Sequence, residues 1–230
     1  MSIIQKENFR GSFLMVVAMA TFALEDSVIK LVSSVLPVGQ ILFLLGVGGA
    51  LAFTGLGLIF KKEFFSTGFF SWPMNSRVVS EVIGRVFYSS ALALTPLSSS
   101  TIILQATPLV VVVGAAVLFK ESVTAIRWFA VILGFFGVVI IVDPGSDSFS
   151  FLSILAVLGM LGFASRDLAS RAVPKALNIF ALGLHGFLSI ALSGIVLHLF
   201  NDEPILLPDI SSWFFLLIGI VLGTTGYSAI

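Results

Sequence analysis

The sequence predicts an all-α integral membrane protein, a bundle of about eight transmembrane helices. Hydrophobic residues make up 58% of its 230 residues and charged residues only 10%, against about 25% charged in a typical globular chain. So few charges cannot cover this much apolar surface in water, and the solvent of the chain is therefore lipid. The apolar runs are continuous, whereas a transmembrane barrel needs strands in which apolar and polar residues alternate.

Eight apolar segments are long enough to cross a bilayer, at roughly 20 residues per crossing. They lie near residues 11–32, 38–60, 78–95, 98–118, 126–142, 151–171, 178–200 and 213–230. The first segment is not a signal peptide, because it is too long, contains Glu25 and Asp26, and lacks a small-residue cleavage site. We therefore expect each segment to form a membrane-spanning helix.

The connections between these segments differ in charge. Basic residues occur before the first segment and around the even-numbered connections, at Lys6, Arg10, Lys61, Lys62, Arg77, Lys120, Arg127, Arg171 and Lys175. The odd-numbered connections contain acidic residues and neither Lys nor Arg. Because cytoplasmic loops carry the excess of Lys and Arg, we expect a multi-pass protein of the cytoplasmic (inner) membrane with its N-terminus in the cytoplasm.

The sequence also contains a weak internal repeat. An offset of 141 residues places 26–30 over 167–171, both of which read Asp-x-x-x-basic, and places Trp72 over Trp213. With the N-terminus in the cytoplasm, the first span of each half would cross in opposite directions. The halves are therefore predicted to be inverted repeats, an arrangement typical of secondary transporters.

The predicted repeats differ in length. Residues 1–142 contain five spans, and residues 143–230 contain three, because Ile230 falls over Ser89 in the middle of the third span. We therefore expect two inverted five-helix repeats of which the second is incomplete, in a truncated gene product, a fragment or a degenerate half.

Several segments of the first half resemble the EamA-type ten-helix transporters of the drug/metabolite transporter (DMT) superfamily. They are 91–96 (ALALTP), 98–101 (SSST), 108–109 (PL), 119–121 (FKE) and the Gly-rich span 127–142. The resemblance implies two five-span halves and secondary transport of a small metabolite. It also implies that Lys120 stands where the family usually has the Gly of a Gly-Glu pair.

Charged residues within the spans are candidates for a substrate pathway or gate, because each costs about 2.5–3.5 kcal/mol at bilayer depth. An outer group and an inner group are expected, comprising Glu25, Asp26 and Lys30, and Glu81, Arg85, Arg166, Asp167 and Arg171. The spacing of four residues predicts same-face pairs at 26/30, 81/85 and 167/171. Either these pairs neutralise each other structurally, or they line a water-filled path and close its two ends in turn.

Three uncharged residues near the middle of the spans are further candidates. Pro108 frees the carbonyl of Leu104, so that this region provides either a plain kink or a substrate contact from Gln105 or the carbonyl. Tyr88 lies one turn beyond Arg85 and either packs or contacts substrate. His185 is interpreted as a hydrogen-bonded structural residue rather than a proton relay.

The sequence therefore predicts a secondary transporter that moves a small polar or amphipathic metabolite by alternating access. The alternative is an inactive or accessory truncated membrane subunit without transport of its own. No hydrolase, metalloprotease or nucleotide-binding motif occurs, so an enzyme is not expected and ATP is not the direct energy source.

The expected partners are a small-molecule substrate and the lipid bilayer. The 12 basic and 12 acidic side chains balance, which provides no basic surface for nucleic acid. The chain has no Cys, and we expect no metal and no cofactor. The glycine spacing leaves a homodimer open.

Overall fold

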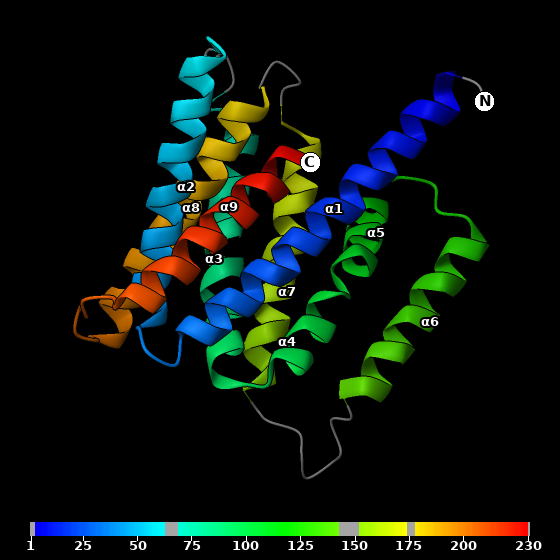
Figure 1. The fold of residues 1–230 in the computed structure, drawn as a ribbon. Helices are drawn as coiled ribbons and strands as arrows, with labels where there is room; N and C mark the ends of the chain where they lie inside the picture. Colours follow the sequence, from blue (N-terminus) through cyan, green and yellow to red (C-terminus); the bar gives the residue numbers. More distant parts are fainter. Residues whose placement is uncertain (1–2, 63–68, 143–151, 174–177, 230) are drawn as a thin grey trace. The chain divides into compact units, whose positions relative to one another are not determined.

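The computed structural model describes residues 3–62, 69–142, 152–173 and 178–229. Throughout these ranges the regular structure is α-helical, which confirms the predicted all-α fold (Figure 1). In chain order the helices are α1 Ile3–Val32, α2 Val38–Ile59, α3 Trp72–Leu94, α4 Leu97–Leu104, α5 Thr107–Leu118, α6 Ala125–Val142, α7 Ser153–Arg171, α8 Ile179–Asn201 and α9 Ile210–Ala229.

Every predicted span coincides with helical structure. Among the described residues, the stretches long and apolar enough to cross a membrane are Gly11–Val32, Val38–Ile59, Leu97–Leu118, Ser153–Arg171, Ile179–Asn201 and Ile210–Ala229. Helix α6 adds a shorter apolar stretch, Ala125–Ile140. Helix α3 is less apolar because it carries Arg77, Glu81 and Arg85. The chain is a multi-span helical membrane protein.

The fourth predicted span is divided into α4 and α5 by a break at residues 105–106. Pro108 has no N–H to donate to the carbonyl of Leu104, one turn earlier. The hydroxyl of Thr107 donates to that carbonyl instead, at 2.5 Å. The carbonyl that Pro108 frees is therefore satisfied within the helix, as a kink requires, while the side chains of Gln105 and Pro108 are exposed.

The chain divides into two compact units, and each unit contains helices from both halves of the sequence. Unit one, from residues 1–69 and 175–230, contains α1, α2, α8 and α9, and unit two, from residues 70–174, contains α3 to α7. The compact units are therefore not the same as the sequence halves 1–142 and 143–230.

In unit one, α2 packs antiparallel to α8 at very short range. Phe53, near the end of α2, lies against Gly183, near the start of α8. At the other end of the pair, a Cβ added to Gly39 would lie 2.8 Å from the backbone N of His198. Small residues let membrane helices approach this closely, which explains Gly39 and Gly46 of α2 and Gly183 and Gly194 of α8.

The second pair in unit one, α1 with α9, is also antiparallel (Figure 1). Gly226 lies against Phe22, and Gly219 lies against Val28. Successive spans of a membrane protein alternate in direction, so antiparallel packing of α1 and α9 is expected if α4 and α5 together make one crossing. In the predicted count of eight spans, α1 is the first crossing and α9 is the eighth, so the two run in opposite directions.

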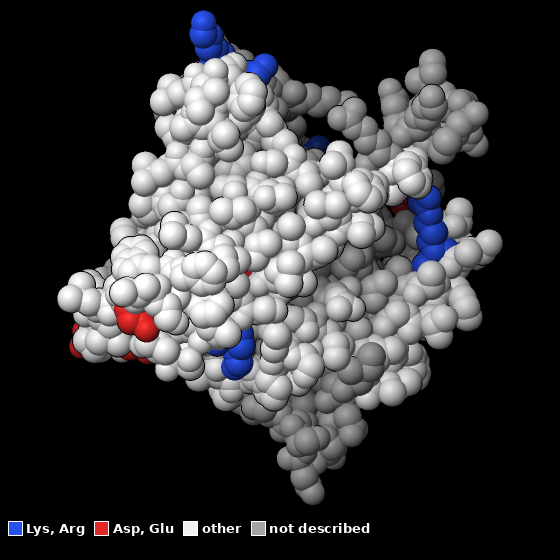
Figure 2. All heavy atoms as spheres, in the orientation of Figure 1, with Lys and Arg blue, Asp and Glu red and all other residues white. Residues whose placement is uncertain are grey.

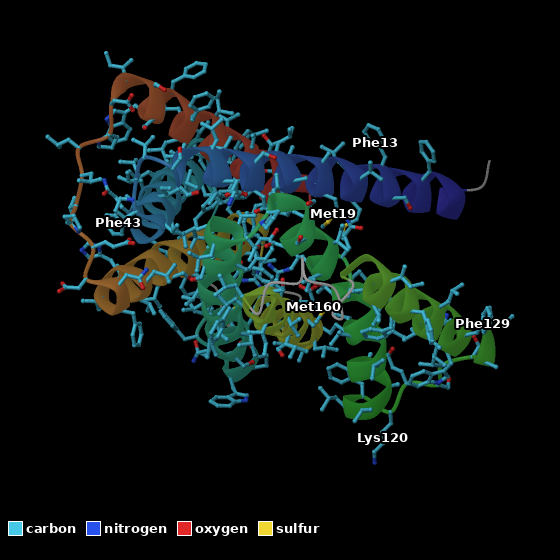
Figure 3. The ribbon with its side chains drawn as sticks, turned by 90° about the horizontal axis from the view of Figure 1, so that it is seen from below. Phe13, Met19, Phe43, Lys120, Phe129 and Met160 are labelled. Atoms are coloured by element: carbon cyan, nitrogen blue, oxygen red, sulfur yellow. The ribbon has the colours of Figure 1, made fainter. Side chains whose placement is uncertain are left out.

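In unit two, α3 packs antiparallel to α7. Gly84 meets Gly162 backbone to backbone, and Tyr88 lies against Gly159. An apolar core contains Ala91, Ile103, Ala106, Ala156 and Met160, the last labelled in Figure 3. Helix α6 packs on α4 and α5. The close crossing of α3 and α7 brings the charged side chains of the two helices together.

Candidate functional site

Ion pairs join α3 to α7 through Arg77 and Glu81, which are buried, and Arg166 and Asp167, which are partly exposed; we call these four residues the ladder. Glu81 has 0% of its surface exposed. One of its carboxylate oxygens lies 3.6 Å from the guanidinium of Arg77 on the same helix, and the other lies 3.5 Å from that of Arg166 on α7. A buried carboxylate between two guanidiniums is strongly coupled to both, because little water screens the charges.

Arg77 belongs to this site although the sequence analysis assigned it to a connection. Helix α3 begins at Trp72, with Pro73 in its first turn, where a missing N–H costs nothing. Arg77 therefore lies in the second turn, is 8% exposed, and donates from Nε to the hydroxyl of Ser170 at 3.1 Å. The spacing of four residues between Arg77 and Glu81 was the signal that could have found it.

The predicted pair of Asp167 with Arg171 is wrong. Asp167 accepts from Arg166, with N–O distances of 2.8 and 2.9 Å. Arg171 pairs with Glu121 at 2.9 Å, and both of these side chains are largely exposed. The physical reason is that the connection between α5 and α6 brings Glu121 to the last turn of α7, a contact that helix spacing cannot reveal.

An aromatic pair continues the ladder along α3 and α7. The guanidinium carbons of Arg85 and Arg166 lie 5.6 and 5.1 Å from the centre of the Phe163 ring. Tyr88 meets the same ring edge-on, with 5.9 Å between centroids. Cations are attracted to the face of an aromatic ring, so Phe163 helps to hold both guanidiniums within the helix pair. The structure thus brings together five predicted residues, Glu81, Arg85, Tyr88, Arg166 and Asp167.

The predicted outer group lies on α1, in unit one. Glu25 is 1% exposed, Asp26 is buried and Lys30 is half-buried. A Cβ added to Gly223 of α9 would lie 3.2 Å from Oε1 of Glu25. The carboxyl group therefore packs directly against the backbone of the neighbouring helix.

Aromatic rings surround this part of unit one. Tyr227 of α9 lies edge-on to Phe22 of α1, at 5.5 Å between centroids, and 5.1 Å from Phe187 of α8. His185 is buried with its ring 3.9 Å from that of Phe69, a packed position for this residue. Within the described ranges, no three side chains of His, Cys, Asp or Glu lie close enough to hold a metal ion.

A bundle of membrane helices with ionisable residues buried between facing helices is typical of membrane transport proteins. The chain belongs to the EamA-like transporter family, which it matches over residues 9–143. This result confirms the resemblance to the DMT superfamily. The family and its named relatives are transporters and not enzymes.

The most similar relatives include two riboflavin transporters. That of Rhizobium johnstonii is 27% identical over 120 residues, 50% of this chain and 40% of the relative. That of Vibrio cholerae is 31% identical over 119 residues, 49% of this chain and 40% of the relative. An S-adenosylmethionine uptake transporter of Rickettsia bellii is 27% identical over 88 residues, 38% of this chain and 30% of the relative. The matched part of the chain thus spans less than half the length of these relatives.

A solved protein crystal structure has the same fold. It aligns with a TM-score of 0.66 and 18% identity, over 95% of this chain and 79% of the other. At this identity the similarity supports the helical architecture alone.

Proposed function

We propose that this protein takes part in secondary transport of a small polar or amphipathic metabolite across the cytoplasmic membrane by alternating access. The observation that carries the proposal is the ladder, in which the buried carboxylate of Glu81 joins α3 to Arg166 of α7. Ionisable residues within membrane spans are costly, are tolerated where they pair with one another or face water, and mark substrate pathways. Membership of the EamA-like family supports the same function.

The ladder serves as the gate on one side of the membrane. Arg166 is its central element, because it contacts Glu81 on α3 and Asp167 on α7. Separation of α3 from α7 would break the ion pair with Glu81 and leave that with Asp167 intact. The guanidinium would then remain neutralised while the path opens.

The two halves are inverted repeats whose helix pairs correspond. In the two repeats, α1 corresponds to α7 and α3 corresponds to α9. The pair α1–α9 therefore corresponds to the pair α7–α3, and both pairs are antiparallel. The offset of 141 residues also places Phe22 over Phe163, and each of these rings meets a tyrosine edge-on, Tyr227 and Tyr88 respectively. Asp26 of unit one then corresponds to Asp167 and forms part of the gate on the other side.

The N-terminus faces the cytoplasm. In unit one, Lys61 and Lys62 lie at one end of α2, whereas acidic side chains gather over the α8–α9 connection, which packs at the opposite end of α2 (Figure 2). This separation of charge supports the positive-inside orientation. Reporter fusions after Phe60, Asp143, Lys175 and Asp209 should read inside, outside, inside and outside. An inside reading after Asp143 would contradict the inverted repeat.

Transport is tested with the purified protein in proteoliposomes and a panel of labelled metabolites. Riboflavin and S-adenosylmethionine come first, because relatives are named for their transport. We expect saturable uptake of at least one compound. Failure of a folded, reconstituted protein to move any of them would contradict the proposal and favour an accessory subunit.

The gate is tested with two single substitutions, Asp26→Asn and Asp167→Asn. Asp167 is the carboxylate that still neutralises Arg166 after Glu81 separates, so it favours the open state on its side. Losing about 1–2 kcal/mol of that interaction shifts the balance of open states about five- to thirty-fold. Cysteines introduced on either side of the path should therefore change accessibility in opposite directions in the two variants. Glu121→Gln, which removes an exposed ion pair, is the control and should change neither side. Equal accessibility in both Asp variants would refute the gate.

A further inference from the structure

The connection between α8 and α9 has an apolar centre with acidic ends. It reads Asp-Glu-Pro-Ile-Leu-Leu-Pro-Asp over residues 202–209. Leu207 is 96% exposed, Ile205 is 75% exposed, and Ile210, the first residue of α9, is 90% exposed. Large apolar side chains this exposed are costly in water.

Three residues of this centre, Pro204, Leu206 and Pro208, present no free backbone donor. Pro204 and Pro208 have no N–H. The N–H of Leu206 donates to the side-chain oxygen of Gln40 at 3.0 Å, and its carbonyl accepts from the side-chain nitrogen of Gln40 at 2.5 Å. Gln40, in the first turn of α2, thus holds both backbone groups of Leu206 as a neighbouring β-strand would. Each satisfied or absent backbone donor lowers the cost of placing irregular chain at the boundary between headgroups and hydrocarbon.

The exposed side chains continue the apolar surface of the adjoining helices. The exposed residues at the end of α8 and in the first turns of α9 are Leu199, Phe200, Trp213 and Phe214. Trp213 is of the type that favours the boundary between membrane and water. The acidic residues Asp202 and Glu203 precede the apolar centre, and acidic side chains gather at this end of the unit in Figure 2.

From these observations we propose that residues 204–210 form an interfacial anchor, which inserts Ile205, Leu207 and Ile210 into the lipid bilayer where headgroups meet acyl chains. Gln40 fixes the depth of the anchor because it ties Leu206 to the first turn of α2. Lipid is the occupant because the exposed apolar surface is continuous with that of α8 and α9, which bilayer lipids cover.

The test uses the absence of native cysteine. A nitroxide is attached to Leu207→Cys in the full chain in phospholipid vesicles, and its collision rates with oxygen, which concentrates in lipid, and with a water-soluble nickel chelate are compared. The control is Ser34→Cys, an exposed polar position in the connection before α2. We expect the oxygen-to-nickel ratio at position 207 to exceed that at 34 several-fold. Equal ratios would overturn the proposal, as would shielding from both reagents, which would indicate a protein contact.

The role of Gln40 is tested in the same labelled protein. Gln40→Leu has nearly the same size and cannot hold the Leu206 backbone. In this variant the oxygen-to-nickel ratio at position 207 should fall towards the ratio at position 34. The nitroxide spectrum at position 207 should also show greater mobility of the label. An unchanged ratio and spectrum would show that Gln40 does not set the depth. Neither measurement depends on transport, so the anchor and the proposed function can fail separately.

Discussion

Replacing Glu81 by Gln removes the charge at the centre of the ladder and keeps its shape. Its carboxylate lies 3.6 Å from Arg77 and 3.5 Å from Arg166, with no exposure to solvent. At an effective dielectric constant of about 20, each ion pair has a Coulomb energy of about 4–5 kcal/mol. Desolvation and partner exchange reduce this value greatly, because measured polar couplings between membrane helices average about 0.6 and reach about 1.7 kcal/mol.

The substitution breaks both ion pairs of Glu81 and leaves two guanidiniums facing each other. It should therefore lower the free energy of unfolding by about 2–3 kcal/mol. The measurement is equilibrium unfolding in mixed micelles, titrated with a denaturing detergent. In a double-mutant cycle, Glu81→Gln and Arg166→Gln should couple by about 1 kcal/mol or more. The second substitution removes a charge that the first leaves with Asp167 as its ionic partner.

The matched control is Glu121→Gln, the same substitution in an ion pair of the same unit. That pair is shorter, at 2.9 Å, but both side chains are largely exposed. Solvent screening should limit its effect to about 0.5 kcal/mol. If Glu81→Gln costs no more than Glu121→Gln, burial does not strengthen the ladder and the reasoning is refuted.

Three further predictions concern the helix crossings and ends. Gly84→Ala places a Cβ 2.9 Å from the backbone N of Phe163 and should destabilise by about 1–3 kcal/mol, whereas Gly55→Ala, with nothing within 4 Å, should be neutral or stabilising. Equal melting temperatures would contradict the close crossing. Lys120 has φ 54°, so Lys120→Gly should raise the free energy of unfolding by about 0.5–1 kcal/mol, and Lys120→Ala, which keeps the Cβ, should show no such gain. Hydrogen bonds from the side chain and backbone of Ser212 hold the pKa of Asp209 below its ordinary value of 3.8. Ionised Asp209 therefore stabilises the start of α9 fully when the pH is above the ordinary pKa of 3.8. This stabilisation is lost as the pH falls through the lower pKa of the folded state. The melting temperature of Asp209→Asn should lack this acid dependence, and an equal dependence in both proteins would exclude Asp209 as its source.

The sequence was sufficient to predict the helices and most of the charged residues of the candidate site, with Arg77 as the exception. Lipid offers no hydrogen bonds to a backbone, so a long apolar run must be helical, whatever surrounds it. For the same reason Glu25, Glu81 and Arg166 were recognisable as candidates, since charge within an apolar run is costly wherever it packs. The break near Pro108 followed from the missing N–H of proline.

The partners of those residues were decided by the tertiary structure. Helical spacing indicates which residues share a face but not which face of another helix they meet. Arg171 was therefore assigned to Asp167, whereas the fold brings it to Glu121, and Arg77 was not recognised as a neighbour of Ser170. Gln40 holds Leu206 across 166 residues of sequence, a contact that no local pattern encodes, because it exists only once α2 and α8 have packed along their glycines.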